Sequence, residues 1–511
     1  MVLQRLLHEQ RCPILANLSQ HTRDEICAEA REFGGELPIL VDEAQLAGES
    51  LGLQWTAEVL LIETKGFEIF YRGPIDDRLN YETEQKRVSH NYLVDANAAL
   101  VKCDKPKESV VKGPGCLISY PAKQRDERKG VSYTKVVAPL LKAKWVDCHT
   151  KGGIGPFALS SHRKARGWSE MMREVVMTRR MPPWHADARH GKFHGDLTLT
   201  AHEQQQLVHW VEQGPEGGES DPLANYQPST PEWVLGRPDA IVEIPTQELP
   251  AKGVLPYRYV ELPSPFDRDV WINGVDVRSG NTRVLHHVIA TIRDPKSKKK
   301  RGEEWLTGFA PGTQPAMFPE DTGIPLQAGK VLRFQLHYTT SGKAETDRTR
   351  LGLYVSDIAP KARLRTKAIS DNKFLISAHD RACSWKKATL IKRDVMLYGL
   401  NLHMHFRGKK MRFELKHPDG RSETLLSVPA YNFNWQRTYV LKEPRVISSG
   451  CVLTLHATWD NSILNPANPD PERDVKWGAQ TFDEMFFATF VHANLSELNA
   501  EDKSLSANLA E

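Results

Sequence analysis

The chain has 511 residues, 40% of them hydrophobic and 26% charged, with a formal net charge of +4. This length predicts about two to four domains, and the composition excludes a largely disordered protein. The small net charge gives no indication of nucleic acid as a partner. No apolar run approaches the ~20 residues that span a bilayer, so we expect no membrane span. The seven cysteines are scattered and odd in number, which excludes a disulfide framework.

The first 103 residues alternate helical and strand patterns. In chain order they predict a helix over Arg23–Phe33 ending at Gly34-Gly35, a buried strand over Pro38–Val41, a hairpin of Glu58–Ile62 with Phe67–Tyr71, and a helix over about His90–Val101. Residues 104–130 are rich in Lys, Pro and Gly, and this composition predicts a linker.

Residues 131–217 favour helices, most clearly over Trp168–Met177 and Ala201–Gln213. Thr200 with Glu203 has the pattern of a capping box before the second of these helices. Residues 218–231 predict a second linker. From residue 232 to residue 497, short β-type runs are punctuated by Gly, Pro, Asn and Asp, which predicts a pair of β-sandwiches. Residues 498–511 are expected to be a polar tail.

Histidines with metal-ligand spacing occur in this β region. His286 and His287 are adjacent in one predicted strand, His337 lies in another, and His403 and His405 form a His-x-His. Residues two apart in a strand face the same side, so His403 and His405 could bind one metal ion. Adjacent strand residues face opposite sides, so His286 and His287 could share a metal only at a bulge or a strand end.

A methionine farther along the chain, Met485, adds a thioether to this pattern. Neutral imidazole suits Cu, Zn, Fe or Ni, whereas a thioether narrows the choice toward copper. A single strand histidine is more often an ordinary core or surface residue, and we interpret His417, His456 and His492 in that way. For the combined pattern the spacing favours metal binding.

These residues, in this order, resemble the copper type II, ascorbate-dependent monooxygenases, the family of peptidylglycine α-hydroxylating monooxygenase. The supporting segments are Gly308–Thr313, Tyr338–Lys343, Thr346–Arg348, Trp459–Ser462, Asn465–Pro469 and Trp477–Met485. The resemblance covers about half of the chain. It implies two jelly-roll-like halves, residues 232–370 and 371–497, each holding one copper ion across a water-filled cleft.

The resemblance also implies a role for each ligand set. The electron-transfer copper would be held by His286, His287 and His337. The catalytic, oxygen-binding copper would be held by His403, His405 and Met485. The implied activity is hydroxylation of an unidentified small-molecule or peptide substrate by O2, with ascorbate or another one-electron reductant. The alternative is a non-catalytic copper-binding or electron-transfer protein; a pocket beside the catalytic set would favour the enzyme, and a closed, dry site the carrier.

A second resemblance falls within residues 131–217. Cys148 and His149, close to Gly152–Phe157, together with Met181 resemble a cytochrome c-like module whose Cys-x-x-Cys-His attaches haem. This implies His149 as the proximal ligand and Met181 as the distal ligand of a haem c that could deliver electrons. Trp145 stands where the first haem cysteine would be. Attachment through Cys148 alone and a haem-free remnant with Cys148 as a buried thiol both stay open.

Residues 1–103 resemble the later part of a thioredoxin-like (redoxin) domain, on Leu37–Glu43, Thr56–Val59 and Tyr71–Arg78. The chain contains no Cys-x-x-Cys, and Cys12 has the context of an apolar strand edge, so a peroxiredoxin-type reductase is disfavoured. The expected fold is therefore multidomain. It comprises a truncated α/β thioredoxin-like segment, a small all-α cytochrome c-like domain and two all-β jelly-roll-like sandwich halves.

The segment Met1–His8 lacks the features of a signal peptide. Proteins that this chain resembles nevertheless assemble copper and covalent haem outside the cytosol. Because the redoxin resemblance begins partway through that domain, we expect an upstream segment with an export signal and a periplasmic or secreted protein. An electron-donor protein is a further expected partner.

Overall fold

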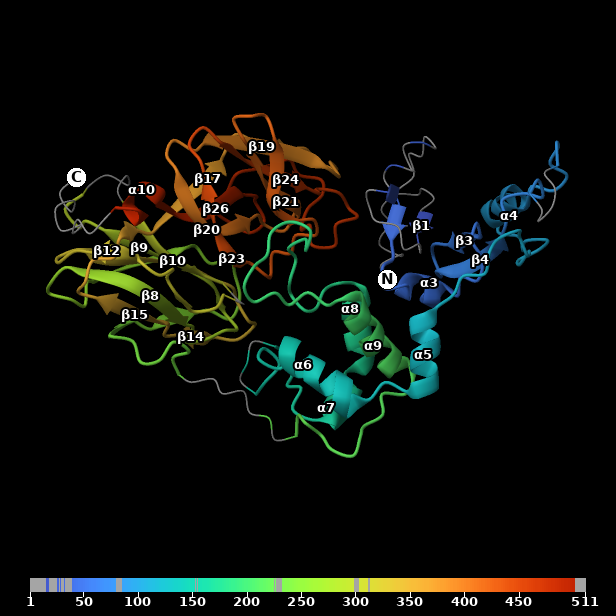
Figure 1. Ribbon diagram of the computed structural model, residues 1–511, viewed down its shortest axis with the longest axis horizontal. Helices are drawn as coiled ribbons and strands as arrows, with labels where there is room; N and C mark the ends of the chain where they lie inside the picture. The colour runs from blue at the N-terminus through green and yellow to red at the C-terminus, as the bar shows by residue number, and fades with distance from the viewer. Residues whose placement is uncertain are drawn as a thin grey trace. The chain divides into compact units, whose positions relative to one another are not determined.

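The computed structural model describes most of the chain. The described residues are 15–17, 25–26, 28, 32, 39–79, 85–151, 153, 155–224, 226, 232–297, 303–310 and 313–500. The chain divides into two compact units (Figure 1). Unit 1 comprises Met1–Pro182 and Leu197–Pro228, and unit 2 comprises Pro183–Asp196 and Ser229–Glu511. The protein is thus multidomain and mostly β-sheet, and its helices lie mainly in unit 1.

Unit 1 combines short strands with helices. Its strands are β1 (Leu15–Asn17), β2 (Ile39–Val41), β3 (Val59–Glu63) and β4 (Glu68–Gly73). Its helices are α3 (Leu46–Leu51), α4 (Tyr92–Val101), α5 (Pro121–Lys129), the π-helix η1 (Tyr133–Val137), α6 (Ala138–Lys144), α7 (His162–Gly167), α8 (Ser169–Met177) and α9 (Ala201–Glu212). β1 pairs with β2 in parallel and β3 with β4 antiparallel, which confirms the predicted hairpin. Most of the helix predicted over Arg23–Phe33 lies outside the described residues, as does Cys12.

Helix α9 begins as the sequence predicts. Thr200 Oγ1 accepts the amide N–H of Glu203 at 3.1 Å, and Glu203 Oε2 accepts the amide N–H of Thr200 at 2.7 Å. Leu207 and Trp210 of this helix pack with Leu141 of α6 in one apolar core. The helical character predicted for residues 131–217 is therefore confirmed for much of that range. The cytochrome c-like and thioredoxin-like identities of the unit stay predictions.

Two predicted boundaries differ from the structure. Residues 104–130, predicted as a linker, contain α5, because Ala122 and Asp126 are buried and Asp126 bonds to α9. Residues Pro183–Asp196, assigned from the sequence to the helical module, belong to unit 2. There Phe193 is buried in the core of the second β-sandwich and pairs with Leu441. Both differences come from tertiary contacts that local composition does not report.

The first β-sandwich of unit 2 has two main sheets. Its strands are β5 (Ala240–Glu243), β6 (Gln247–Leu249), β7 (Arg258–Pro263), β8 (Val270–Arg278), β9 (Leu285–Arg293), β10 (Glu304–Phe309), β11 (Ala316–Met317), β12 (Thr322–Leu326), β13 (Val331–Tyr338), β14 (Glu345–Asp347), β15 (Arg350–Ser356) and β16 (Ala362–Arg363). One sheet has the order β10-β9-β13-β7, and the other has the order β16-β12-β8-β15-β5. Buried side chains such as Ile272 and Phe334 fill the space between them.

The second β-sandwich repeats this layered arrangement. Its elements are β17 (Arg365–Asp371), β18 (Leu375–Ile376), β19 (Cys383–Leu390), β20 (Val395–His403), β21 (Gly408–Lys416), β22 (Ser422–Val428), β23 (Thr438–Ile447), β24 (Val452–Trp459), β25 (Val475–Lys476), β26 (Phe486–Asn494) and helix α10 (Leu495–Leu498). The two sheets have the orders β17-β26-β20-β23 and β19-β24-β21-β22. Phe413 and Leu455 are fully buried in the core between them.

The alternation of side chains along the strands places the predicted ligands on facing sheets. In β13, Leu336 enters the first core, so His337 beside it points out of that sandwich. In β20, Leu402 enters the second core, so His403 points out of the second sandwich. Tyr398, also in β20, packs with the first core. The register of β20 shifts between Leu397 and Gly399. Tyr398 therefore lies on the same face as His403 rather than on that of Leu402, and this face is turned toward the first sandwich.

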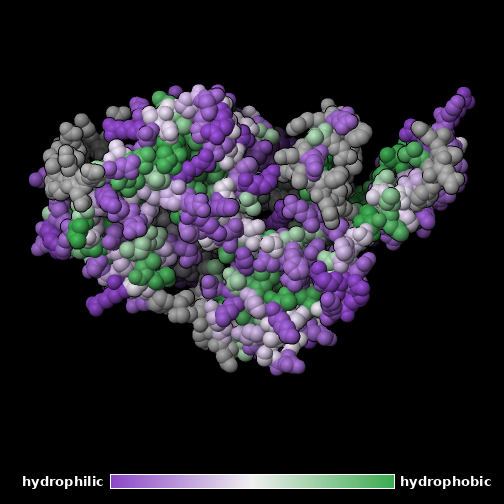
Figure 2. Space-filling model, viewed as in Figure 1, coloured by the Kyte–Doolittle hydropathy of each residue, from purple (hydrophilic) through white to green (hydrophobic). Residues whose placement is uncertain are grey.

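The surface of the molecule is largely hydrophilic on the face shown in Figure 2. Apolar side chains that are exposed in unit 1 include Val94 and Val101 of α4. Within the part of the chain that the structure describes, no helix has both the length and the apolar character needed to cross a bilayer.

Candidate metal centre

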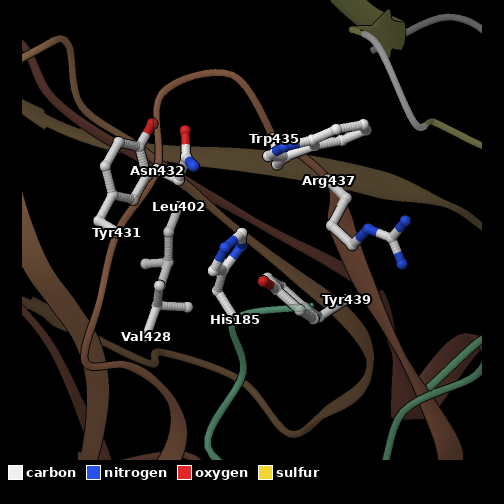
Figure 3. Close-up of a pocket in the computed structure, with 8 residues that line it drawn as sticks. All are labelled: His185, Leu402, Val428, Tyr431, Asn432, Trp435, Arg437 and Tyr439. Atoms are coloured by element: carbon white, nitrogen blue, oxygen red, sulfur yellow. The ribbon is translucent and has the colours of Figure 1, made fainter. Parts of the chain in front are cut away.

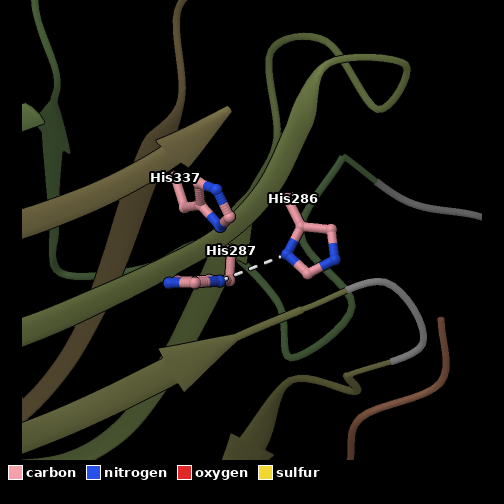
Figure 4. Close-up of side chains that lie close together, drawn as sticks. All are labelled: His286, His287 and His337. Atoms are coloured by element: carbon pink, nitrogen blue, oxygen red, sulfur yellow. Dashed lines mark hydrogen bonds between the residues drawn. The ribbon is translucent and has the colours of Figure 1, made fainter. Parts of the chain in front are cut away.

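Three histidines from two neighbouring strands converge in the first sandwich. His287 of β9 pairs with His337 of β13, but the next pair along the ladder is Leu285 with Tyr338. His286 is therefore the extra residue of a β-bulge, and all three rings lie close together (Figure 4). One ligand nitrogen from each ring lies within 4.8 Å of the other two, and the Nδ1 atoms of His286 and His287 are 3.2 Å apart. The bulge that metal sharing required is present.

The three rings are neutral at physiological pH. Burial, reinforced by the neighbouring histidines, lowers the pKa of His286 to about 3 and that of His337 to about 4. The pKa of His287 lies well below its usual value for the same reasons. A neutral imidazole keeps a lone pair for a metal ion. Nδ1 of His337 is buried and has no hydrogen-bond partner among the described residues, so a bound ion would satisfy it.

Tyr257 joins this histidine set to the second sandwich. Its ring lies edge-on to His337 with 4.7 Å between the ring centroids. Its hydroxyl donates to the carbonyl oxygen of Ala479 at 2.7 Å. Burial raises the pKa of Tyr257 to about 12, so the hydroxyl stays protonated and keeps donating. Ala479 belongs to the segment that leads to Met485. Tyr257 therefore contacts a predicted ligand of the first set, His337, and also holds the backbone that precedes Met485 of the second set.

The second predicted set lies where β20 ends. β20 pairs with β26 so that His403 faces Phe487, and the same register continued by two residues would set His405 opposite Met485. The ring centroids of His403 and His405 are 5.2 Å apart. The half-buried Met485 immediately precedes β26. The fold thus brings the His403–His405 segment and the backbone of Met485, which is far along the chain, to the same strand end.

Hydrogen bonds determine which nitrogen of these two rings is available. Nδ1 of His403 lies 2.6 Å from Oε1 of Gln436, and Nδ1 of His405 lies 3.2 Å from the carbonyl oxygen of Asp483. Both partners are acceptors, so each Nδ1 carries the proton and each Nε2 keeps the lone pair. Burial lowers the pKa of His403 to about 4 and that of His405 well below its usual value. Both rings can therefore serve as neutral ligands through Nε2.

The loop between β22 and β23 supports this set. The Tyr431 hydroxyl accepts the amide N–H of Met404 at 3.0 Å and donates to the carbonyl oxygen of the same residue at 2.8 Å. These two bonds fix the backbone between His403 and His405. Gln436, which orients His403, comes from the same loop and donates to the carbonyl oxygen of Phe433 at 2.9 Å.

Phe433 contacts both histidine sets. Its side chain is 8% exposed and stacks on His286, with 4.7 Å between ring centroids and 15° between ring planes. Its centroid also lies 5.8 Å from that of His405 and 6.5 Å from that of His403. The resemblance implied a water-filled cleft between the two sets. In the structure an apolar ring occupies part of that space.

Four of the residues that organise the site were not found from the sequence: Tyr431, Phe433, Gln436 and Glu484, whose buried carboxylate accepts the amide N–H of His405 at 2.9 Å. The first three lie in a loop whose composition is ordinary for a strand connection, and their role depends on contacts with residues far along the chain. Glu484 had one weak signal, an acidic residue directly before a predicted ligand.

Both sets fit copper in their donor chemistry. Three neutral imidazoles and two neutral imidazoles beside a thioether are soft or borderline ligands of the kind that copper takes. The orphaned nitrogen of His337 and the oriented Nε2 atoms of His403 and His405 are consistent with metal binding. Zinc also accepts imidazole, so the thioether of Met485 carries the preference for copper.

The residues predicted to hold haem lie in unit 1. His149 is buried, and its Nδ1 lies 3.1 Å from the carbonyl oxygen of Phe157, which leaves Nε2 with the lone pair. Burial lowers the pKa of His149, so the ring is neutral. Trp145 is buried in the helical core, against which Met181 packs. One neutral imidazole is thus suitably oriented, while haem binding by Cys148, His149 and Met181 stays a prediction.

A small hollow and a larger, open one both lie in unit 2. One, of about 10 Å³, is lined by His185, Leu402, Val428, Tyr431, Asn432, Trp435, Arg437 and Tyr439 (Figure 3). It has room for about one water molecule, which excludes it as a binding site for an organic substrate. The other, of about 540 Å³, is open and lined mainly by polar and charged groups such as Arg189, Glu423 and Arg445. Neither hollow is lined by His403, His405 or Met485.

The comparisons with known proteins leave the family open. No protein-family model matches the chain, and no curated protein matches it. Among solved structures, the STIV MCP is 9% identical, with 51% of this chain and 98% of that chain covered and a TM-score of 0.25. The major capsid protein P2 from bacteriophage PM2 is 11% identical, with 51% and 99% covered and a TM-score of 0.22. These scores are too low to support a statement about fold or function.

Proposed function

We propose that unit 2 is a copper-dependent monooxygenase of the copper type II, ascorbate-dependent kind. The observation that supports this most is the presence of two neutral histidine sets on facing sheets. The three-imidazole set, His286, His287 and His337, would hold the electron-transfer copper. The set of His403, His405 and Met485 would hold the copper that meets O2, because a thioether stabilises Cu(I).

Bound copper would supply one-electron transfer and O2 activation for hydroxylation of a substrate C–H bond. The chain would provide orientation and a dry environment. Gln436 and the carbonyl of Asp483 hold the two imidazoles with Nε2 directed away from these acceptors. Tyr431 fixes the backbone that joins the two imidazoles. Phe433 keeps water from part of the space beside both sets, which strengthens electrostatic interactions there.

The co-substrates follow from the same proposal. The reductant would be ascorbate or another one-electron donor, and the substrate a small organic molecule or a peptide. A haem c held by Cys148, His149 and Met181 would supply one-electron transfer to the copper sites; an electron-donor protein is the alternative source. The haem route is tested by the absorption spectrum of protein produced in a host that attaches haem covalently. Purified protein without haem absorption would contradict this route.

Export to the periplasm or secretion belongs to the proposal through the resemblance alone. Fractionation of cells that express the native gene would test it, since recovery of the protein only in the cytosol would contradict export.

The decisive experiment measures substrate-coupled O2 consumption by copper-loaded protein with ascorbate, over a panel of C–H donors. With ¹⁸O2, the hydroxylated product should carry the label. Copper binding at both sets without stimulation of O2 uptake by any donor would contradict monooxygenase activity.

A copper-binding or electron-transfer protein is the second candidate. The specific observation in its favour is Phe433, whose ring fills part of the space where a substrate would approach the catalytic set. Such a protein would exchange electrons reversibly with ascorbate and a partner, and it would yield no hydroxylated product.

A further inference from the structure

A buried carboxylate accepts hydrogen bonds from the two chain segments that carry His405 and Met485. Glu484 is fully buried. Its Oε2 accepts the amide N–H of His405 at 2.9 Å and the indole N–H of Trp459 at 3.0 Å, and the amide nitrogen of Met485 lies 3.3 Å from the same oxygen. Its Oε1 accepts the amide N–H of Arg407 at 2.6 Å. Four N–H donors thus converge on one side chain.

We propose that Glu484 is a positioning residue that holds the His-x-His segment and the Met485 segment together as one metal site. This inference rests on the proposed copper site and extends it. Two of the four donors, the amides of His405 and Met485, belong to the backbone units that carry the ligand side chains. His405 and Glu484 are 79 residues apart in the sequence, so the carboxylate is a direct link between the two segments.

The four N–H groups require an acceptor at both oxygen positions of the side chain, which a carboxylate provides. An ionised carboxylate accepts through both oxygens and donates nothing, whereas a carboxamide has one accepting oxygen and an NH₂ group that donates. At this position the NH₂ of glutamine would face N–H groups and leave at least one of them without an acceptor. Burial raises the pKa of Glu484 to about 7, and the N–H groups that point at the carboxylate oppose this shift because they favour its ionised form.

Arg407 does not neutralise Glu484 through a direct side-chain ion pair, because its guanidinium is engaged elsewhere. Its Nε donates to Oδ1 of Asn461 at 2.7 Å, and its NH1 donates to the carbonyl oxygen of Phe482 at 2.8 Å. Arg407 therefore links its own segment to Phe482, near Met485, by a second route. This route should preserve the fold of the region when Glu484 alone is changed.

The test compares Glu484→Gln with Glu63→Gln in the full-length protein. Glu63 serves as a control away from the site: its partly exposed carboxylate also accepts two backbone N–H groups, those of Lys65 and Gly66, but in unit 1. The first readout is amide hydrogen exchange of the metal-free protein. The amides of His405, Arg407 and Met485 should exchange about tenfold faster in Glu484→Gln, since the hydrogen bonds that the carboxylate accepts from them are lost or weakened. They should be unchanged in Glu63→Gln.

The second readout is X-ray absorption of the protein loaded with Cu(I) alone. The wild type and Glu63→Gln should show sulfur scattering from Met485, and Glu484→Gln should lose it while total copper is retained. Wild-type exchange rates and wild-type sulfur scattering in folded Glu484→Gln would overturn the positioning role. If Glu484→Gln does not fold, Glu484→Asp replaces it; the shorter carboxylate should lose the same signals, and their retention would overturn the role.

The two proposals fail differently. Wild-type protein that binds no copper at the His403 set would contradict the proposed function. The exchange rates of the metal-free protein would then still decide whether Glu484 holds the two segments together, and unchanged rates would overturn that link.

Discussion

Replacement of His209 by leucine should destabilise unit 1 by roughly 3 kcal/mol. Nδ1 of His209 lies 2.8 Å from Oδ2 of Asp126, and Nε2 lies 2.9 Å from Oε2 of Glu49, with all three side chains at most 9% exposed. Because both ring nitrogens face carboxylate oxygens, the ring donates from both and is the imidazolium cation. Removing one partner of a buried ionic pair typically costs about 3–5 kcal/mol. We take the low end because Asp126 keeps Arg125 at 2.8 Å.

Hydrogen exchange resolved by peptide is the suitable assay, because a chain of two units need not unfold in one step. A loss of ~3 kcal/mol corresponds to roughly 100-fold faster exchange through opening of α3, α5 and α9. Peptides from unit 2 should not change. His202→Leu, at an exposed position on the same helix, is the control. A change of less than about tenfold in α9, or an equal change in the control, would refute the reasoning.

The same cluster predicts a pH dependence. Burial alone lowers the pKa of His209, but the hydrogen bonds and charges of Glu49 and Asp126 outweigh it and raise this pKa above the usual 6.5. A raised pKa in the folded state means that the stabilisation is fully present below about pH 6.5 and is lost as the pH rises through the folded value. The difference in protection between wild type and His209→Leu should therefore shrink with increasing pH above 6.5. A difference that grows over this range would show that the ring is not the cation.

Three further predictions concern unit 2. Protein loaded with copper and desalted should hold two copper ions per chain and His337→Ala one, by metal analysis; two ions in the variant would contradict the three-histidine site. Met485→Leu should abolish substrate-coupled O2 uptake while keeping copper at the three-histidine set, and retained uptake would remove Met485 from the site. Phe433→Ala should cost about 3 kcal/mol through lost packing and speed extraction of Cu(I) by a chelator. Phe318→Ala, in the first sandwich, should not speed extraction, and equal rates in the two variants would contradict the shielding role of Phe433.

Much of the β architecture could be predicted, because short β-type runs separated by Gly, Pro, Asn and Asp are a local feature of the sequence. The pairing of His403 with His405 also follows from the two-residue period of a strand. From the sequence, His286 and His287 could be expected to share one metal site only if a bulge or a strand end placed both rings on the same side. Whether a bulge forms depends on how β13 pairs with β9, and specifically on Tyr338 facing Leu285, which is a long-range choice.

The missed features share a physical cause. Helix α5 is rich in Lys and Arg and has a weak local pattern, and only the burial of Asp126 beside His209 shows its place in the fold. Phe433 likewise has no local mark that distinguishes it from other loop aromatics. Its importance lies in a contact with His286, which is far away in the sequence. Single-sequence patterns do not encode such contacts.

Because of the bulge at His286, the three-histidine site depends on the number of residues in β9 between the two that face His337 and Tyr338. Deleting Leu285, which faces Tyr338, would let His286 take its place in a regular ladder, with its ring on the side of the sheet opposite to that of His287. Short insertions and deletions at the start of β9 should therefore abolish the site even when every histidine is retained. Conversely, such a site can arise during evolution by inserting a single histidine codon into a strand pair that already presents two imidazoles.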